Sequence, residues 1–291
     1  MQRLPARKVE TVATKTLELK LAHSPDSDDA FMFYGLATKK ISTGHLRFKH
    51  VLEDIETLNR RALEGLYDIT ALSFPAYAHI SKAYALLPCG ASFGDGYGPI
   101  VVARGPLGPE GLRGKRVAIP GKLTTAFLTV QLYEPQIEPM FSPFDRILER
   151  VTEGEADAGV VIHEGQLTYA QVGLTKVVDL GEWWYKETGL PLPLGATVIR
   201  RSLDRETIYQ VAKLMRESVQ YGLDHREETL AYAVQFSRGL DPITADRFVS
   251  MYVNERTLRY SEDDRLAVQT LLDRGFEKGL LPCQVEAEFA E

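Results

Sequence analysis

One histidine stands where packing gives no reason for a basic side chain. His163 follows the apolar run Asp157-Ala-Gly-Val-Val-Ile, which predicts a buried strand. The ordinary explanation is a half-buried ring whose nitrogens bond to nearby carbonyls. In open α/β sheets, however, ligands bind beyond the carboxyl ends of the strands, so a titratable group there is a functional candidate. With an unperturbed pKa of about 6.5, the imidazole is suited to take a proton.

A second candidate is the polar bend Ala22-His-Ser-Pro-Asp-Ser-Asp-Asp-Ala-Phe31. Its aspartates lack the alternating oxygen ligands, central glycine and distal glutamate of a calcium loop, so we expect no metal. Asp and Ser favour helix N-termini, and Ser27 or Asp28 is expected to cap the following helix. Asp29 or Asp26 then remains to accept hydrogen bonds from ligand hydroxyls.

A third candidate is Ile119-Pro-Gly-Lys-Leu-Thr-Thr-Ala-Phe127, a predicted strand, bend and helix without an acid at the helix start. Free amides at a helix N-terminus attract an anion. The segment lacks the spacing of a nucleotide P-loop, and no dinucleotide-binding glycine motif follows any strand. The pattern therefore indicates a single carboxylate at Thr124, which can also cap its helix.

Nucleophilic and redox chemistry is less well supported. Ser73 lacks a Gly-x-Ser-x-Gly elbow, and Cys89 lies inside an apolar strand. The second cysteine, Cys283, is too distant in sequence for a metal or redox motif. The residues therefore favour neither a serine or cysteine nucleophile nor a redox or metal-binding cysteine pair.

The elements that must position these residues alternate between strand and helix, which favours an α/β fold with sheets flanked by helices. In the first unit, strands are expected at 17–24, 46–54, 68–73, 85–93 and 99–104, and helices at 28–39, 55–64 and 75–82. In the second, strands are expected at 116–120, 137–142 and 158–163, and helices at 124–133 and 145–153. Strands at 176–180 and 193–199 and helices at 204–225, 226–238, 243–252 and 261–278 complete the chain.

The two units resemble each other. Glu64-Gly65 and Glu153-Gly154 each end a predicted helix, and an Asp opens the strand that follows. Ser73 and His163 would then end equivalent strands and point into one cleft. The segment 181–193, which holds both tryptophans, is expected to form a wall or lid of that cleft, although packing is at least as good an explanation.

Composition excludes several partners. The chain has 291 residues and a formal net charge of −6, with its basic residues spread along the sequence. We therefore expect no nucleic-acid partner and no membrane partner. The first seventeen residues contain charges and no apolar signal region, so a cytoplasmic location is expected.

The dispersed motifs of the chain, taken together, resemble the 1,4-dihydroxy-6-naphthoate synthase family of the futalosine route to menaquinone. The similarity begins near residue 19 and covers nearly the whole chain. It is carried by Ser24-Pro25 with Asp29, Phe31-Met-Phe-Tyr34, Val51-Leu-Glu-Asp-Ile-Glu-Thr-Leu-Asn59, Leu72-Ser73, Gly98-Pro-Ile-Val-Val-Ala-Arg-Gly-Pro106, Thr124-Thr-Ala126, Ile162-His-Glu164, Val178-Asp-Leu-Gly181, Trp183-Trp184, Thr188-Gly-Leu-Pro-Leu-Pro-Leu-Gly-Ala196 and Tyr252-Val-Asn254.

The resemblance implies a two-lobed, periplasmic-binding-protein-like (type II) fold with mixed sheets and a ligand cleft between the lobes. Lobe one is expected at 17–104 and 195–291, lobe two at 105–194, and a flexible N-terminal extension at 1–16. It also implies a lyase without cofactor or metal that acts on cyclic dehypoxanthine futalosine, a small carboxylate substrate. The site residues that we assign are the catalytic base His163 and the substrate-binding residues Ser73, Leu72, Thr124, Thr125, Ala126, Asp29 and Asn59.

The chain also departs from the family pattern. Asp26 and Asp28 replace uncharged residues of the usual Ser-Pro-Cys-Pro-Asn-Asp-Thr-Phe opening, and Ala71 replaces a common lysine. Two alternatives therefore stay open: a non-catalytic solute-binding protein for a small carboxylate, and the related chorismate dehydratase of the same pathway. A monomer or a homodimer is expected.

Overall fold

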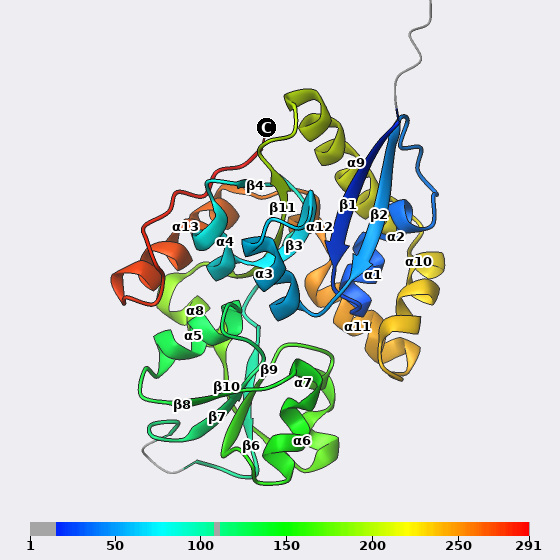
Figure 1. The fold of residues 1–291 in the computed structure, drawn as a ribbon. Helices are drawn as coiled ribbons and strands as arrows, with labels where there is room; N and C mark the ends of the chain where they lie inside the picture. Colours follow the sequence, from blue (N-terminus) through cyan, green and yellow to red (C-terminus); the bar gives the residue numbers. More distant parts are fainter. Residues whose placement is uncertain (1–15, 108–110, 291) are drawn as a thin grey trace, which may run out of the picture.

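Two helix-covered β-sheets form separate lobes in the computed structural model, which describes residues 16–107 and 111–290 (Figure 1). We call residues 16–98 and 192–290 lobe one, and the described residues from 99 to 191 lobe two. The strands of lobe one are β1 (Leu17–His23), β2 (Leu46–Leu52), β3 (Ile69–Ser73), β4 (Tyr84–Leu86), β5 (Ser92–Gly94) and β11 (Leu192–Arg200). Those of lobe two are β6 (Ile100–Ala103), β7 (Arg116–Ile119), β8 (Glu138–Phe141), β9 (Ala158–Val161) and β10 (Thr175–Asp179).

Five strands of each sheet share one topology, and the lobe-one sheet has β5 in addition, which pairs with β11. Lobe one has the order β2-β1-β3-β11-β4, in which β1 pairs parallel with β2 and β3, and β11 runs antiparallel to β3. Lobe two has the order β10-β6-β9-β7-β8, in which β7 pairs parallel with β8 and β9, and β6 runs antiparallel to β9. The strands β3 and β9 therefore occupy equivalent places, as the sequence repeat predicted.

Helices cover both faces of each sheet (Figure 1). Lobe one has α1 (Ser27–Met32), α2 (Tyr34–Ala37), α3 (Ile55–Leu63), α4 (Phe74–Ile80), α9 (Arg205–Asp224), α10 (Arg226–Ala233), the 3₁₀ turn η3 (Val234–Phe236), α11 (Pro242–Tyr252), α12 (Glu255–Leu258) and α13 (Glu262–Glu277). Lobe two has α5 (Thr125–Tyr133), η1 (Phe144–Arg146), α6 (Ile147–Thr152), α7 (Gly165–Thr168), η2 (Tyr169–Val172) and α8 (Leu180–Thr188).

Local sequence explains where these helices begin and end. Asp54 caps α3 by accepting the Thr57 amide, and Asp204 caps α9 by accepting the Thr207 amide. Gly65 and Gly154 follow α3 and α6 with φ angles of +68° and +82°, a left-handed conformation that glycine adopts without a steric penalty. The same helix ending thus precedes β3 and β9, each of which is the middle strand in the order of its sheet.

Several local expectations were wrong. The helix expected at 28–39 is two short helices, and its N-cap is Asp26, without a side-chain capping bond, rather than Ser27 or Asp28. The strand at 99–104, which we placed in lobe one, pairs with β9 and β10 in the second sheet. Its apolar sequence fits the interior of either sheet, so only the long-range pairing decides its place.

The segment with both tryptophans is also different from the expected wall or lid. It forms helix α8, and Trp184 is fully buried with its indole N–H donated to the carbonyl of Pro191 at 3.2 Å. Trp184 belongs to the same apolar core as Tyr77 and Leu271 of lobe one. Packing, the alternative explanation, therefore accounts for this residue.

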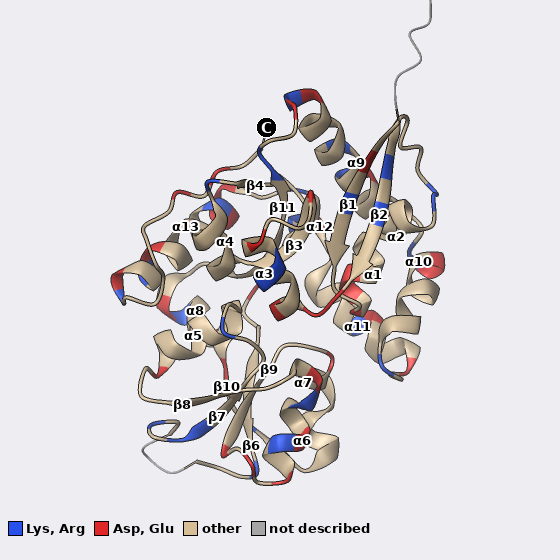
Figure 2. Ribbon diagram, viewed as in Figure 1, with Lys and Arg blue, Asp and Glu red and all other residues tan. Residues whose placement is uncertain are grey.

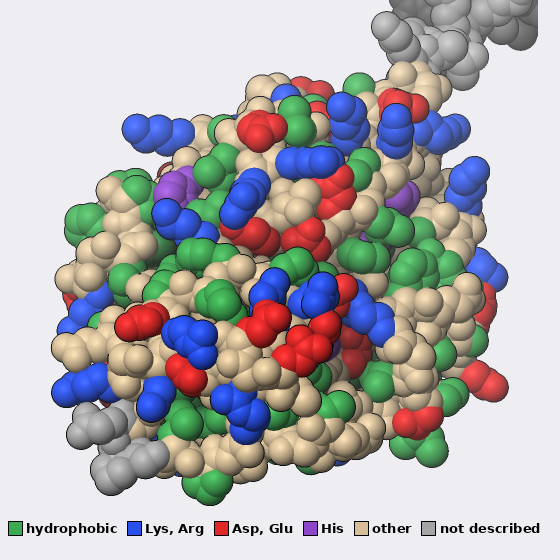
Figure 3. Space-filling model, turned by 60° about the horizontal axis from the view of Figure 1, so that its bottom comes forward, with side chains coloured by type: hydrophobic (Ala, Val, Ile, Leu, Met, Phe, Trp, Pro, Cys, Tyr) green, Lys and Arg blue, Asp and Glu red, His purple; other side chains and the backbone are tan. Residues whose placement is uncertain are grey.

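Charge is distributed without a basic stripe. Lysines and arginines are scattered over both lobes (Figure 2), and on the face shown in Figure 3 acidic and basic side chains lie next to each other. In residues 16–107 and 111–290, no helix is long and apolar enough to cross a bilayer. The N-terminal extension expected at 1–16 lies outside the described residues, apart from Thr16.

Candidate functional site

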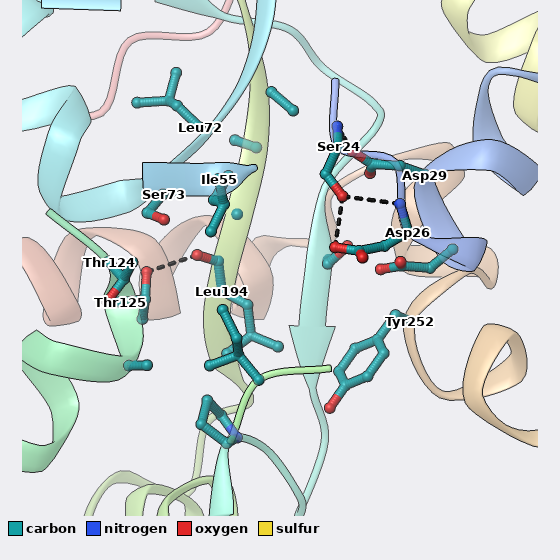
Figure 4. Close-up of a pocket in the computed structure, with 18 of the residues that line it drawn as sticks. Ser24, Asp26, Asp29, Ile55, Leu72, Ser73, Thr124, Thr125, Leu194 and Tyr252 are labelled. Carbon is teal, nitrogen blue, oxygen red and sulfur yellow. Dashed lines mark hydrogen bonds between the residues drawn. The ribbon is translucent and has the colours of Figure 1, made fainter. Parts of the chain in front are cut away.

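A pocket lies between the two lobes and has about 790 Å³ of atom-free space, part of it open to solvent. Lobe one contributes the loop after β1, the end of β3 and the start of β11, whereas lobe two contributes the start of α5 and the residues after β9 (Figure 4). The lining residues include six of the eight predicted site residues, namely Asp29, Leu72, Ser73, Thr124, Thr125 and Ala126. Asn59 and His163 are not in this lining.

The bend after β1 forms an acidic wall. The carboxylate of Asp29 accepts the Ser24 amide at 2.6 Å, and Asp26 accepts the Ser24 hydroxyl at 2.6 Å. Asp28 lines the pocket beside them, and no other described residue donates a hydrogen bond to its carboxylate. The carboxylates of this wall can accept hydrogen bonds from ligand hydroxyls.

Burial changes the acidity of this wall. Desolvation raises the pKa of Asp29 from 3.8 to about 7, and the neighbouring Asp26 adds to the rise. Desolvation together with the nearby carboxylates raises the pKa of Asp28 well above its ordinary value. Carboxyl groups that stay protonated near neutral pH can donate hydrogen bonds as well as accept them.

Ser73 is the last residue of β3 and forms hydrogen bonds with a buried asparagine, Asn59. The side-chain oxygen of Asn59 accepts the Ser73 amide at 2.8 Å, and its NH₂ group lies 3.2 Å from the Ser73 hydroxyl oxygen. Asn59 therefore acts on Ser73 rather than on a ligand. Since the hydroxyl oxygen already accepts this bond, its own hydrogen is free to donate into the pocket.

The start of α5 faces this serine from lobe two (Figure 4). Thr124 caps the helix by accepting the Phe127 amide at 3.2 Å, as the sequence predicted, and Thr125 donates its hydroxyl to the carbonyl of Leu194 at 2.6 Å. Within the described residues, no acceptor is bonded to the amides of Thr125 and Ala126. Two free amides at the positive end of a helix form an anion-accepting corner of the pocket.

His163 lies just outside the pocket, two residues beyond the end of β9. Its Nδ1 accepts the Gly165 amide at 2.9 Å, so Nε2 carries the hydrogen and donates it to the Phe144 carbonyl at 3.1 Å. Ile162 and Gln166, on either side of it in sequence, line the pocket. The ring is thus buried next to the cleft, and both of its nitrogens are bonded within lobe two.

The electrostatics around His163 favour its neutral form. Desolvation is the largest cause and lowers the pKa, and the guanidinium of Arg238 lowers it further. The carboxylates of Glu164 and Asp26 and the Phe144 carbonyl act in the opposite direction. The net shift is downward, so the ring is neutral at neutral pH.

Sequence reasoning missed the polar contacts that join the lobes here. The hydroxyl of Tyr252 in α11 donates to Gln166 at 2.7 Å, and both residues line the pocket. Arg238 of lobe one binds Glu164 of lobe two at 3.0 Å. The only sequence signal for these contacts was Tyr252-Val-Asn254, a family motif, because Arg238 was the last residue of a predicted helix and no motif marked it.

In residues 16–107 and 111–290, no group of three or more His, Cys, Asp and Glu side chains is arranged to hold a metal ion. The pocket has two polar surfaces that bind different chemical groups. The α5 start accepts an anionic group, while the acidic wall and Ser73 accept or donate to hydroxyls.

Comparison with known proteins places this pocket in context. Residues 19–277 match the model of a family described as menaquinone biosynthesis. A Thermus thermophilus protein named 1,4-dihydroxy-6-naphthoate synthase is 43% identical over 90% of this chain and 95% of its own. A Streptomyces coelicolor protein of the same name is 36% identical over 91% of this chain and 95% of its own.

Solved structures agree on the fold. A protein of Archaeoglobus fulgidus is 46% identical, has a TM-score of 0.88 and matches 91% of this chain and 98% of its own. An alkanesulfonate-binding protein of Xanthomonas axonopodis is only 14% identical but has a TM-score of 0.72 over 94% of this chain and 98% of its own. The second similarity shows the two-lobed binding-protein fold, as the sequence predicted, and nothing about the ligand.

Proposed function

The chain belongs to the menaquinone biosynthesis family, and from this premise we propose that it is a 1,4-dihydroxy-6-naphthoate synthase acting on cyclic dehypoxanthine futalosine. The observation that carries the proposal is the pocket between the lobes. It joins the free amides of Thr125 and Ala126 to the hydroxyl-binding groups Ser73 and Asp29. The substrate has a carboxylate and a sugar-derived part, which match these two surfaces. The two curated relatives do not favour the solute-binding or dehydratase alternatives.

The substrate binds through two polar surfaces of the pocket, the start of α5 and the pair Ser73 and Asp29. We place the substrate carboxylate at the α5 start, where free amides and the helix dipole stabilise negative charge. Ser73 donates to the sugar-derived part, and Asp29, with its pKa raised to about 7, accepts from or donates to a hydroxyl. The lobes exclude water from the substrate and fix its orientation.

His163 acts as the general base in this proposal, and it must leave its present bonds to do so. The Nδ1 lone pair that would take the proton accepts the Gly165 amide. Rotation of the side chain about the Cα–Cβ bond frees this lone pair. The same rotation turns the ring toward the pocket, which the adjacent residue Ile162 lines. Proton removal then drives ring opening and elimination of the sugar-derived part. As a biosynthetic enzyme of this family, the protein is expected in the cytoplasm.

The test is turnover of cyclic dehypoxanthine futalosine by the purified protein, with the naphthoate measured by chromatography. We expect product from the wild type and a loss of at least about 100-fold in kcat for His163→Gln. The matched control is His79→Gln, because His79 is an exposed histidine on α4. Absence of product from the wild type overturns the function, whereas full activity of His163→Gln overturns only the role of the base.

A further inference from the structure

An arginine of lobe one binds both lobes at once beside the pocket. The guanidinium of Arg238 lies 2.5 Å from the Asp26 carboxylate of its own lobe and 3.0 Å from the Glu164 carboxylate of lobe two. The second oxygen of Glu164 accepts the Ser27 hydroxyl at 3.0 Å. Only 3% of Glu164 is exposed, so its bonds to Arg238 and Ser27 are screened less by solvent than those of a surface pair. We call Arg238, Glu164, Asp26 and Ser27 the clasp.

The backbone at Arg238 is held in an uncommon conformation. Its φ angle is +54°, in the left-handed region that residues with a Cβ rarely adopt, and Gly239 follows with +85°. Arg238 follows the turn η3, and this conformation places its side chain across the cleft. An arginine kept in a strained turn, where glycine would be unstrained, points to a requirement for its side chain.

The clasp also borders the segment that holds His163. The Arg238 guanidinium lies 4.6 Å above the Phe144 ring, and Phe144 gives its carbonyl to the His163 ring. Glu164 is 4.0 Å from Nδ1 of His163. Each contact that Arg238 makes in lobe two is therefore adjacent to the proposed base.

We propose that Arg238 is a positioning residue, which holds the lobes closed over the pocket by binding Glu164 and Asp26 together and so fixes the His163 segment for the reaction. This inference rests on the proposed function for its link to turnover, whereas lobe closure stands on the geometry alone. Opening the lobes separates Arg238 from Glu164. The Glu164 carboxylate then stays beside His163 without its counter-charge.

The charges around His163 give this proposal a distinctive signature. Glu164 from its own segment and Asp26 from lobe one raise the His163 pKa, Arg238 lowers it, and the η1 turn contributes the Phe144 carbonyl, which raises it. The Asp145 carboxylate of that turn raises the pKa of Arg238. Removal of Arg238 is therefore expected to raise the pKa of His163, and removal of the Glu164 charge to lower it.

Two variants separate this role from a general packing role. Arg238→Met keeps an unbranched apolar side chain but removes the guanidinium and its charge, and Glu164→Gln keeps the shape of the carboxylate without its charge. The matched control is Arg113→Met, which removes an ion pair with Glu134 inside lobe two alone. Thermal melting checks that every variant is folded.

Lobe closure is measured without substrate, by double electron–electron resonance. The spin labels are attached at Tyr209→Cys in lobe one and Val172→Cys in lobe two. Both positions are exposed, and the exposed Cys283 is replaced by serine. We expect a narrow distance distribution for the wild type and Arg113→Met, and a broader, longer one for Arg238→Met and Glu164→Gln. An unchanged distribution for Arg238→Met overturns the proposal.

Histidine proton NMR gives the second readout, with the His163 signal assigned by comparison with His163→Gln. We expect the His163 titration to move to higher pH in Arg238→Met and to lower pH in Glu164→Gln. If turnover is detected, KM rises roughly tenfold in Arg238→Met, because less of the protein is in the closed state that binds substrate. An unchanged His163 titration in Arg238→Met overturns the role of the clasp, and it does so whether or not the wild type turns over.

Discussion

The side chain of Asn59 binds Ser73 at two points, through the amide at 2.8 Å and through the hydroxyl at 3.2 Å. Asn59 is fully buried in α3, and Ser73 is the last residue of β3. This pair joins a helix to the central strand of lobe one. It sets both the position of the serine and the direction in which its hydroxyl can donate.

Replacing Asn59 with aspartate tests that direction. The carboxylate introduced by Asn59→Asp still accepts the Ser73 amide, but its second oxygen accepts where the NH₂ group had donated, so the serine hydroxyl turns away from the pocket. We expect the KM for substrate to rise roughly 3–10-fold, which corresponds to one lost hydrogen bond. Ser73→Ala is the reference, and thermal melting checks folding. A KM unchanged from the wild type would show that Ser73 does not donate to the substrate.

The anion corner at α5 is tested by Thr124→Asp. Aspartate is as good an N-cap as threonine, so stability should be retained, but its charge repels a carboxylate bound at the Thr125 and Ala126 amides. We expect KM to rise by more than about tenfold, and added salt to reduce the effect. Thr124→Ala is expected instead to cost about 1 kcal/mol of stability in chemical denaturation. Equal KM values for Thr124→Asp and the wild type would place the carboxylate elsewhere.

Asp29 predicts a pH dependence of stability. Because its pKa is about 7 in the folded protein and 3.8 as a model value, the folded state binds the proton more tightly than the unfolded state. The contribution of Asp29 to the free energy of unfolding is fully present below pH 3.8 and is lost as the pH rises through about 7. Asp29→Asn keeps an oxygen for the Ser24 amide and removes the titration. We expect the free energy of unfolding of the wild type, relative to this variant, to fall between about pH 4 and 7. A constant difference over that range would contradict the raised pKa.

Gly121 of lobe two lies against Glu56 of lobe one, where the two lobes meet. A Cβ at this position would be 2.6 Å from the Cβ of Glu56, whose carboxylate accepts the Leu123 amide at 3.0 Å. Gly121→Ala should therefore prop the lobes apart, because the contact is between lobes rather than within one core. We expect KM to rise several-fold and the melting temperature of each lobe to change little. Gly105→Ala is the control, since nothing lies within 4 Å of a Cβ there. A large loss of stability in Gly121→Ala would show that the contact belongs to one rigid core.

Much of the fold could be predicted from local patterns. The alternation of apolar runs and amphipathic stretches indicated most strands and helices, and the glycines after two helices, Gly65 and Gly154, revealed the repeat of the two sheets. The family resemblance added Leu72 and Ala126, whereas polar residues at the ends of predicted strands supplied Asp29, Ser73, Thr124 and Thr125 of the pocket lining. These features depend on residues close in sequence, so periodicity and turn chemistry suffice to find them.

Long-range pairing decided the rest. The apolar run 99–104 suits either sheet, and only its partners β9 and β10 place it in lobe two. Glu164 bonds to Ser27, 137 residues away in sequence, and to Arg238, 74 residues away. His163 was visible in the sequence as a basic residue after a strand, but the direction of its ring is set by the Phe144 carbonyl and the Gly165 amide.

The sequence by itself thus determined two α/β units in series and their polar strand ends, because each follows from short-range periodicity and capping, and the family resemblance implied the two-lobed fold. The tertiary structure alone decided which carboxylate meets which cation and where each hydroxyl donates. Those choices depend on hydrogen bonds between segments that only folding brings within about 3 Å of one another.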